Sequence, residues 1–340
     1  MSQKQGKVIS VSDNYGSTIR IRDFEPGDTE GCLKLLQLGH TPEFTRERFE
    51  WLHFQNPMAP SRIVVAEYKG QIVGLYSAIK KQVTIFGKTY IGARDVDPVV
   101  HPRFRKKGIF TAMLDYALEH YREIDFHFNF ANAFSRSGFL KRGWREIGSL
   151  SDCLYQVHYD RVPSKAFLLY ALSHLRRIER QHTAQELDSV DREEFANLYA
   201  ENRTGICVSR TYAYVNWRYR DNPLYKYYQI ADGPGPGISK LAIGKPDRLH
   251  GTFTLHDFFV AQGSADCSMD YLVNYVRDNS FDVLRTWRTC SAALRSQMIY
   301  NPRSRHSALR FFVRKCSQHI PDALYDMDKW LLTPGDLEVM

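Results

Sequence analysis

The sequence predicts a mixed α/β fold arranged as two domains, and three observations lead to this prediction. Its 340 residues, 43% of them hydrophobic and 25% charged, suffice for two cores of ordinary size. Strand-like and helix-like segments follow one another in the first half in the order β-α-α-β-β-β-α-β-α-β. A weak internal repeat then relates the second half to the first.

Each element of the first half is predicted from its own periodicity and from the residues that end it. Strands are expected where apolar residues alternate with polar ones, and helices where they recur at i, i+3 and i+4, as Phe110, Met113 and Leu114 do. The expected elements are a strand at 18–24, helices at 31–38 and 46–55, strands at 62–67, 71–80, 83–86 and 89–100, a helix from 109 to about 121, a strand at 125–131 and a helix at 135–142.

The stretch from Ile91 to Leu114 joins a strand to a helix through a basic turn that contains Gly108. Pro98 favours a splayed or edge strand with free backbone groups. Unpaired N–H groups at a helix N-terminus, with cations beside them, suit a phosphate, and glycine permits close approach. The residues alone leave open a plain solvated loop that caps an ordinary helix. The cations of this turn are Arg103, Arg105, Lys106 and Lys107.

The segment HPRFRKKGIFTAML, residues 101–114, resembles the pyrophosphate-binding motif of the GNAT acyltransferases, R/Q-x-x-G-x-G/A. Arg105 and Gly108 match that motif directly, and Lys107 matches its variant HP-x-[YF]-R-x-K-G-[IL]-F; Phe110 stands where many members have a second small residue. The resemblance implies that the backbone of Val99 and Val100 pairs with the pantetheine arm of acetyl-CoA or another acyl-CoA. The residues implied for the diphosphate are Arg105, Lys106, Lys107, Gly108, Ile109, Phe110 and Thr111.

A second segment, FNFANAFSRSGFLKRGW at 128–144, resembles the next conserved block of the same family, N-x-x-S-x-x-x-[FY]-x-K-x-G-[FW]. The matching positions are Asn132, Ser135, Phe139, Lys141, Gly143 and Trp144. Of these, the resemblance implies that Asn132, Ser135 and Phe139 flank the coenzyme arm. Two motifs in the expected order and at the expected separation are more specific than either alone.

The second half repeats features of the first. Trp51 precedes Asn56-Pro57 by the same spacing that separates Trp217 from Asn222-Pro223, and segments 268–276 and 281–286 echo 111–120 and 124–128. The junction at 260–267 carries no cation and no R-x-x-G, so we expect a GNAT-like domain that has lost coenzyme binding. This tandem arrangement with one working coenzyme site resembles the N-myristoyltransferase-like and mycothiol synthase-like families. The blocks NWRY…NP and WLLTPGD (Trp330–Asp336) are similar to those of two-domain GNAT proteins associated with surface-polysaccharide gene sets. The predicted ranges are 1–16 for a flexible lead-in, 17–158 for the acyl-CoA domain, 159–182 for a connecting segment and 183–340 for the degenerate domain.

Acyl transfer to an amine requires a base that keeps the amine neutral and donors for the tetrahedral oxyanion. Asp95 and Asp97, two residues apart on the coenzyme-facing strand, are expected to share one face, and one of them is the predicted base or amine anchor. The alternative for Asp97 is a cap on the Pro98 turn. His127 is a candidate proton relay or a buried structural histidine. The tyrosine that many GNAT enzymes use as acid is absent, which leaves Ser135 in that role or the role vacant.

Residues 212–228 are rich in tyrosine and tryptophan, which either stack on a sugar or form core. Arg210, Arg218 and Arg220 either bind an acceptor phosphate or are surface charges.

The leading functional hypothesis is an acyl-CoA-dependent N-acyltransferase in which a small amine attacks the thioester directly in a ternary complex. Family association favours acetyl-CoA as donor and an amino sugar, plain or nucleotide-linked, as acceptor. The alternatives are a Fem-type peptidyltransferase that uses aminoacyl-tRNA, against which the intact R-x-x-G speaks, and a non-catalytic module that binds CoA or a glycan precursor.

Composition narrows the expected partners and location. The net charge of +8 suits an anionic ligand, but the charges are spread along the chain, so nucleic acid is not an expected partner. Six scattered cysteines without metal-ligand spacing predict reduced thiols and no metal site. The sequence shows no run of ~18 apolar residues and no signal-peptide core, so we expect a cytoplasmic protein without a membrane span. The sequence does not reveal the oligomeric state.

Overall fold

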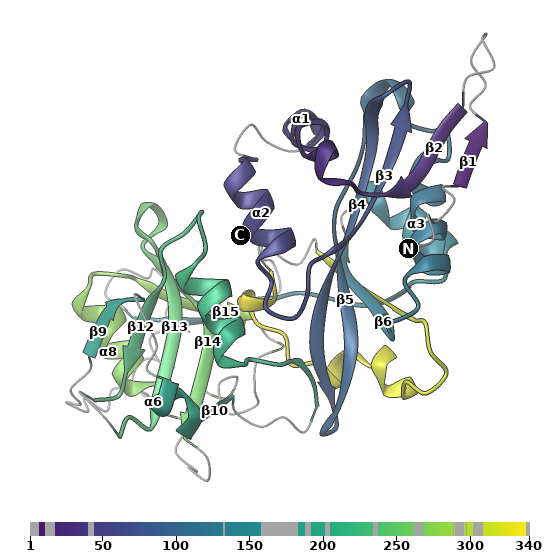
Figure 1. The fold of residues 1–340 in the computed structure, drawn as a ribbon. Coiled ribbons are helices and arrows are strands. Elements are labelled where there is room, and N and C mark those ends of the chain that lie inside the picture. The colour runs from purple at the N-terminus through teal and green to yellow at the C-terminus, as the bar shows by residue number, and fades with distance from the viewer. Residues whose placement is uncertain are drawn as a thin grey trace. The chain divides into compact units, whose positions relative to one another are not determined.

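The computed structural model describes residues 7–10, 18–39, 44–131, 133–157, 183–187, 192–200, 205–233, 237–261, 268–287, 289, 296, 298–301 and 309–337. The chain divides into two compact units, and each contains one mixed β-sheet (Figure 1). The first unit takes the residues up to Ser149 together with Leu309–Lys329, and the second takes Leu150–Ala308 together with the residues from Trp330 on. The predicted mixed α/β class is confirmed.

The first unit follows the predicted element order between residues 18 and 149. Its sheet has the order β1-β2-β3-β4-β5-β6-β17-β7, in which β5 and β6 are parallel and the other neighbours antiparallel. The elements are β1 (Lys7–Ser10), β2 (Thr18–Asp23), α1 (Thr29–Gly39), α2 (Arg46–Phe54), β3 (Arg62–Tyr68), β4 (Gln71–Ile85), β5 (Lys88–Val100), α3 (Ile109–His120), β6 (Phe126–Ala131), α4 (Ala133–Lys141), β7 (Arg145–Ser149) and β17 (Arg310–Lys315).

The sheet of the second unit has the order β16-β8-β15-β14-β13-β12-β9, with β10 paired to β14. Here β14 and β15 are the parallel neighbours. The elements are β8 (Asp152–Gln156), β9 (Thr183–Glu186), α6 (Arg192–Asn197), β10 (Leu198–Ala200), β11 (Ile206–Val208), α7 (Tyr212–Val215), the π-helical turn η4 (Asn216–Arg220), β12 (Tyr228–Ala231), β13 (Lys240–Asp247), β14 (Thr252–Ala261), α8 (Asp270–Asp278), β15 (Val283–Trp287) and β16 (Ile299–Asn301).

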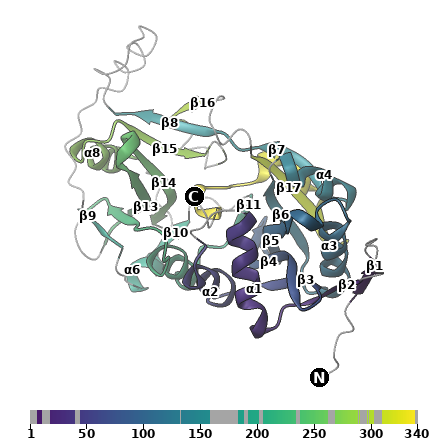
Figure 2. The same ribbon diagram turned by 90° about the horizontal axis from the view of Figure 1, so that it is seen from above.

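The two sheets have equivalent plans, and in each a strand from the other half of the chain lies next to the parallel pair. In both, a helix joins the parallel pair: α3 joins β5 to β6, and α8 joins β14 to β15. The strand beyond β6 is β17, which lies between β6 and β7 (Figure 2), and the strand beyond β15 is β8, which lies between β15 and β16. Each exchanged strand covers a sheet edge that would otherwise present unpaired backbone groups.

This exchange changes the predicted ranges. Strand β8 lies inside the predicted range 17–158 but belongs to the second unit, whereas 309–329 lies inside 183–340 but belongs to the first. Part of the expected flexible lead-in, Lys7–Ser10, forms β1 and pairs with β2. The expected connecting segment 159–182 lies outside the described residues.

The sheet of the first unit is covered on two faces (Figure 2). On one, which we call the α3 face, α3 packs against the strands through Ile109, Met113, Leu114, Val64, Tyr76, Ala78 and Ala93. On the other, the α1–α2 face, the core contains Cys32, Leu36, Phe49, Ile63, Val65, Leu75 and Val99. Neighbouring residues such as Val64 and Val65 point to opposite faces, as the period of a β-strand requires.

The repeated Trp–Asn-Pro segments form matching turns. In the first unit the Asn56 side chain follows α2, and its Oδ1 accepts the N–H of Met58 at 3.1 Å. In the second, the Asn222 side chain follows η4, and its Oδ1 accepts the N–H of Leu224 at 2.9 Å. Both turns lead into a strand, β3 or β12, so the repeat marks the same position in the two sheets.

Candidate functional site

Strand β5 contains a bulge at Asp97. Its register with β4 shifts between the pairs Leu75–Val99 and Ser77–Val96, so two residues of β5 face one residue of β4. Asp97 takes a left-handed conformation with φ of 52°. A bulge interrupts the alternation of side chains, and the prediction that Asp95 and Asp97 share one face is therefore wrong: Asp95 lies on the α3 face, and Asp97 approaches α2.

Strands β5 and β6 separate beyond the bulge. Their parallel pairing runs from Gly92–Phe126 to Arg94–Phe128 and does not continue to the ends of the two described strands, Val100 and Ala131. Val99 and Val100 pair with β4 on one side, while their other side faces the opening. The splayed strand predicted from Pro98 is thus present.

The basic turn between β5 and α3 presents a series of backbone N–H groups. Lys106 and Gly108 are both left-handed, with φ of 63° and 78°. The first bond that continues into α3 is the one from the Ala112 N–H to the Gly108 carbonyl, 2.9 Å. Within this fully described stretch, the N–H groups of residues 106–111 have no acceptor. Such groups at the positive end of a helix dipole form an anion-binding concavity.

The charges and the glycine of this turn fit the same role. Arg103, Arg105, Lys106 and Lys107 are exposed, and Arg105 Nε donates to the Val100 carbonyl at 3.2 Å, beside the opening. No atom lies within 4 Å of the position that a Cβ of Gly108 would occupy, so its backbone conformation rather than crowding favours glycine there. Cations around converging N–H groups suit a phosphate or diphosphate.

The bulky Phe110 is accommodated by α4. A Cβ at Gly138 would lie 2.3 Å from the Phe110 ring, and the Phe110 and Phe139 rings meet edge to face at 5.3 Å. Phe139 is buried and Ser135 half-buried. The Ile109 side chain lies in the core and Thr111 is half-buried, so Ile109 can offer a ligand little more than its N–H. Asn132 lies outside the described residues.

A buried polar cluster on the α3 face joins three strands. Asp95 Oδ1 lies 2.7 Å from His127 Nδ1 and accepts the Tyr76 hydroxyl at 2.6 Å. Burial alone would lower the pKa of His127, but the Asp95 carboxylate raises it to about 10. His127 is therefore a cation at neutral pH and is not available as a base. Sequence reasoning did not identify Tyr76, because a tyrosine in an alternating strand is normally core.

Asn129 lies on the same strand face as His127, one residue past the last β5–β6 pair. Its side chain is 2% exposed, and neither its oxygen nor its nitrogen has a hydrogen-bond partner in the described part of the chain. The Asp95 Oδ2 atom is also buried and without a hydrogen-bond partner in the described part of the chain. Buried amides are normally satisfied, so an unpartnered one at a strand opening is consistent with a ligand there.

Asp97 lies close to a histidine that sequence reasoning missed. His53 of α2 is completely buried, with Nε2 3.8 Å from Asp97 Oδ2. Burial, with a contribution from Arg48, lowers the pKa of His53 to about 3, so the imidazole is neutral. At this bulge the Asp97 carboxylate can receive a proton from an amine, whereas the His53 imidazole stays neutral because of its low pKa. The only available signal was the position of His53 within the repeated Trp–Asn-Pro segment.

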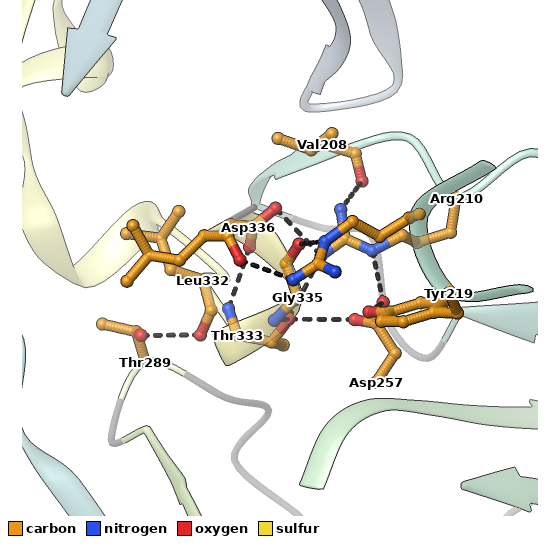
Figure 3. A network of polar contacts seen from close by, with 11 residues as sticks. Val208, Arg210, Tyr219, Asp257, Thr289, Leu332, Thr333, Gly335 and Asp336 are labelled. Atoms are coloured by element: carbon orange, nitrogen blue, oxygen red, sulfur yellow. Dashed lines mark hydrogen bonds and ion pairs between the residues drawn. The ribbon is translucent and has the colours of Figure 1, made fainter. Parts of the chain in front are cut away.

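The second unit has an equivalent of this pair, but its own residues occupy it. Matching the parallel pairs Gly92–Phe126 and Thr252–Val283 places Asp257 where the first unit has Asp97, and the repeat places Tyr219 where it has His53. Asp257 accepts the Tyr219 hydroxyl, Arg210 Nε at 2.7 Å and Thr333 Oγ1 at 2.9 Å (Figure 3). Such a fully hydrogen-bonded carboxylate serves packing rather than proton transfer.

Of the three arginines singled out in the second unit, Arg210 and Arg218 are structural, contrary to both predicted roles. Arg210 is buried and also lies 2.9 Å from Asp336. Arg218, completely buried, donates to the Gly335 carbonyl at 3.1 Å, to the Tyr227 hydroxyl at 2.9 Å and to the Leu337 carbonyl. Only Arg220 is a surface charge, paired with Asp221. Of the two roles predicted for the aromatic residues at 212–228, core packing fits better than sugar stacking, because Tyr214, Trp217, Tyr219 and Tyr227 are buried.

Neither a metal cluster nor a membrane-spanning helix is found among the described residues. No group of three or more His, Cys, Asp and Glu side chains there is arranged to hold a metal ion. No helix there is long and apolar enough to cross a membrane.

Residues 20–147 match the family model of the acetyltransferase (GNAT) domain. The match includes the bulge, the opening between β5 and β6, and the basic turn. The first unit therefore carries a GNAT acetyltransferase domain, as its two motifs predicted. A search of curated proteins found no match.

The structure is similar to several solved structures. A conserved protein of unknown function from Enterococcus faecalis V583, described as a probable N-acyltransferase, is 15% identical with a TM-score of 0.62, over 88% of this chain and 73% of that one. A GCN5-related N-acetyltransferase from Anabaena variabilis ATCC 29413 is 11% identical with a TM-score of 0.63, over 88% and 73%. N-myristoyltransferase from Saccharomyces cerevisiae, bound to myristoyl-CoA, is 11% identical with a TM-score of 0.55, over 97% and 86%. The last match spans both units and supports the predicted two-domain GNAT fold.

Proposed function

We propose that this chain is an acyl-CoA-dependent N-acyltransferase whose catalytic part is the GNAT domain of the first unit. One observation carries the proposal: the unpaired N–H groups of residues 106–111 lie in a basic turn next to the opening between β5 and β6. A diphosphate with an extended amide-bearing arm is the ligand that this combination suits. The donor we propose is acetyl-CoA.

In this proposal the diphosphate binds the turn amides, with Arg105 and Lys107 as counter-charges. The pantetheine arm lies along the open side of Val99 and Val100, and Arg105 exchanges its bond to the Val100 carbonyl for one to the coenzyme. The unpartnered Asn129 amide is within the same opening and suits an amide of the arm. Asn132, Ser135 and Phe139 remain proposed contacts on the α4 side.

The chemical step follows from the groups near the bulge. The neutral amine attacks the thioester carbonyl carbon, the C–S bond breaks, and CoA leaves as its thiolate. The proton released by the amine passes to the Asp97 carboxylate, beside the neutral His53 imidazole, and a proton from solvent, delivered directly or relayed through the Ser135 hydroxyl, neutralises the thiolate. Backbone N–H groups at the bulge suit the transient oxyanion. Asp95, Tyr76 and His127 act as positioning residues that hold β4, β5 and β6 together at the opening.

For the acceptor we propose a small amine, in particular an amino sugar or its nucleotide-linked form. Its support is the family resemblance stated above. A thiolate of low basicity leaves readily, so the missing tyrosine acid is compatible with activity.

The test compares two glycine variants of the full chain. Gly108→Glu places a carboxylate in the turn, and Gly70→Glu is its matched control, because Gly70 has φ of 77° and equally open surroundings in the same unit. At 100 times Kd a ligand raises the free energy of unfolding by about 2.7 kcal/mol. CoA and acetyl-CoA should give this stabilisation to the wild type and to Gly70→Glu but not to Gly108→Glu.

Turnover is then measured as thiol release from acetyl-CoA with a panel of amines that includes amino sugars. Release with at least one amine supports acyl transfer. Stabilisation by CoA without release from any amine would favour the binding-module alternative, and stabilisation by aminoacyl-tRNA instead of CoA would favour the peptidyltransferase.

A further inference from the structure

The second unit contains a pocket of about 410 Å³ that the proposed acyl transfer does not use. It lies between β13, the 3-10 turn at Arg248–His250, β14 and β15, and its lining residues all belong to the second unit. Its volume is in the range of small-molecule sites, roughly 300–1,000 Å³. It therefore suits a small molecule rather than a polymer.

The pocket is strongly positive. Lys245, Arg248 and Arg285 line it with one carboxylate, Asp247, so three positive charges and one negative leave +2. Asp247 itself lies 2.9 Å from His250 Nδ1. Burial, then Arg218, Lys245 and Arg285, lower the pKa of His256 at the pocket wall well below its usual value. His256 is therefore neutral and adds no charge to the pocket.

Two of the cations contact other side chains of the lining. Arg285 Nη2 donates to Thr254 Oγ1 at 2.9 Å, and Lys245 Nζ lies 3.7 Å from the centre of the Tyr225 ring. Both cations thus lie at the pocket wall, within reach of an anionic ligand.

The rim adds apolar surface. Leu249 is 88% exposed, and it lines the pocket together with the Tyr225 ring. An inorganic ion would use only the cations, whereas an organic phosphate would also contact the leucine and the ring. We propose that this pocket binds a small organic phosphate, a sugar phosphate or a nucleotide, separately from the basic turn of the first unit. The proposal stands whether or not the first unit transfers acyl groups.

The experiment is calorimetric titration of the full chain with uridine 5′-diphosphate, glucosamine 6-phosphate and inorganic phosphate. The Gly108→Glu variant serves as background, because it removes the basic turn as a competing phosphate site. Lys245→Gln and Arg248→Gln each remove one cation from a side chain that is at least partly exposed. Arg277→Gln on α8, also exposed but outside the pocket lining, is the matched control.

We expect at least one of the two organic phosphates to bind in the Gly108→Glu background and to bind more tightly than inorganic phosphate. Lys245→Gln and Arg248→Gln should each weaken that affinity about tenfold or more, and Arg277→Gln should leave it unchanged. No binding of either organic phosphate in the millimolar range would overturn the proposal. The proposal would also be overturned if Lys245→Gln and Arg248→Gln both kept the full affinity for the organic phosphates, or if only Gly108→Glu abolished their binding. Inorganic phosphate that binds as tightly as the organic phosphates would overturn it as well.

Discussion

The buried cluster of Asp95, His127 and Tyr76 makes a quantitative prediction about stability and pH. Asp95→Asn keeps the shape of the side chain but removes the charge that holds His127 protonated. In the wild type the pKa of His127 is about 10, against about 6.5 for an ordinary histidine. In Asp95→Asn the imidazole becomes neutral at pH 7, which is three pH units below the pKa of His127 in the wild type. Removing the proton from the folded protein at this pH costs ~4 kcal/mol.

The sign of the pH dependence follows from the raised pKa. The folded state holds this proton more tightly than the unfolded state, so the stabilisation is complete below pH 6.5 and is lost as the pH rises through 10. The free energy of unfolding of the wild type should therefore exceed that of Asp95→Asn by ~4 kcal/mol at pH 6.5 and by ~1 kcal/mol at pH 9.5. The value at pH 6.5 agrees with the ~3–5 kcal/mol typical of breaking a buried ion pair.

The assay is urea unfolding at pH 6.5, 7.5, 8.5 and 9.5, followed by circular dichroism and tryptophan fluorescence. Arg136→Gln is the control, because Arg136 and Glu146 form an exposed pair that should be worth less than ~1 kcal/mol at every pH. A difference between wild type and Asp95→Asn that stays constant across this pH range would refute the charged pair. So would a variant as stable as the wild type at pH 6.5.

Four other substitutions test packing and chemistry. Gly138→Ala should lower the free energy of unfolding by ~1–3 kcal/mol, because its Cβ meets the Phe110 ring, even though alanine has the better helix propensity. Urea unfolding of the double variant with Phe110→Ala should show that the two substitutions are not additive. Additive effects would argue against the clash. Arg218→Gln should cost ~3–5 kcal/mol in the same assay, since it strands two buried carbonyls, and a loss below ~1 kcal/mol would contradict its anchoring role. Asp97→Asn should slow thiol release ~100-fold or more, while the affinity for CoA changes less than twofold. His53→Phe should also slow thiol release. An unchanged rate in Asp97→Asn would show that Asp97 is not the base.

Much of the first unit could be predicted because its signals are local. Thr45 begins α2 as expected and accepts the Arg48 N–H at 3.2 Å. Gly108 immediately precedes α3, and the basic turn has the backbone form that its residue types favour. The resemblance to the GNAT motifs allowed the fold to be predicted as well, because that family has a fixed order of elements around the motifs.

The missed features depend on contacts between distant residues. The apolar run at Arg310–Lys315 indicates a strand, but no local pattern tells that it lies between β6 and β7. The bulge at Asp97 breaks a period-two expectation that held for the rest of β5, and only folding brings His53 to it. A charged residue such as Arg218 is normally expected at the surface. The carbonyls that accept its hydrogen bonds and allow its burial lie more than 100 positions further along the chain.

The central claim is that the backbone amides of the basic turn bind the coenzyme, and amide hydrogen exchange measures those amides directly. The exchange of residues 95–111 is compared with and without saturating CoA, with the Arg248–Leu255 region of the second unit followed in parallel. The account predicts slower exchange at 106–111 in the complex and little change at 248–255. Unchanged exchange at 106–111, with protection confined to the second unit, would contradict it.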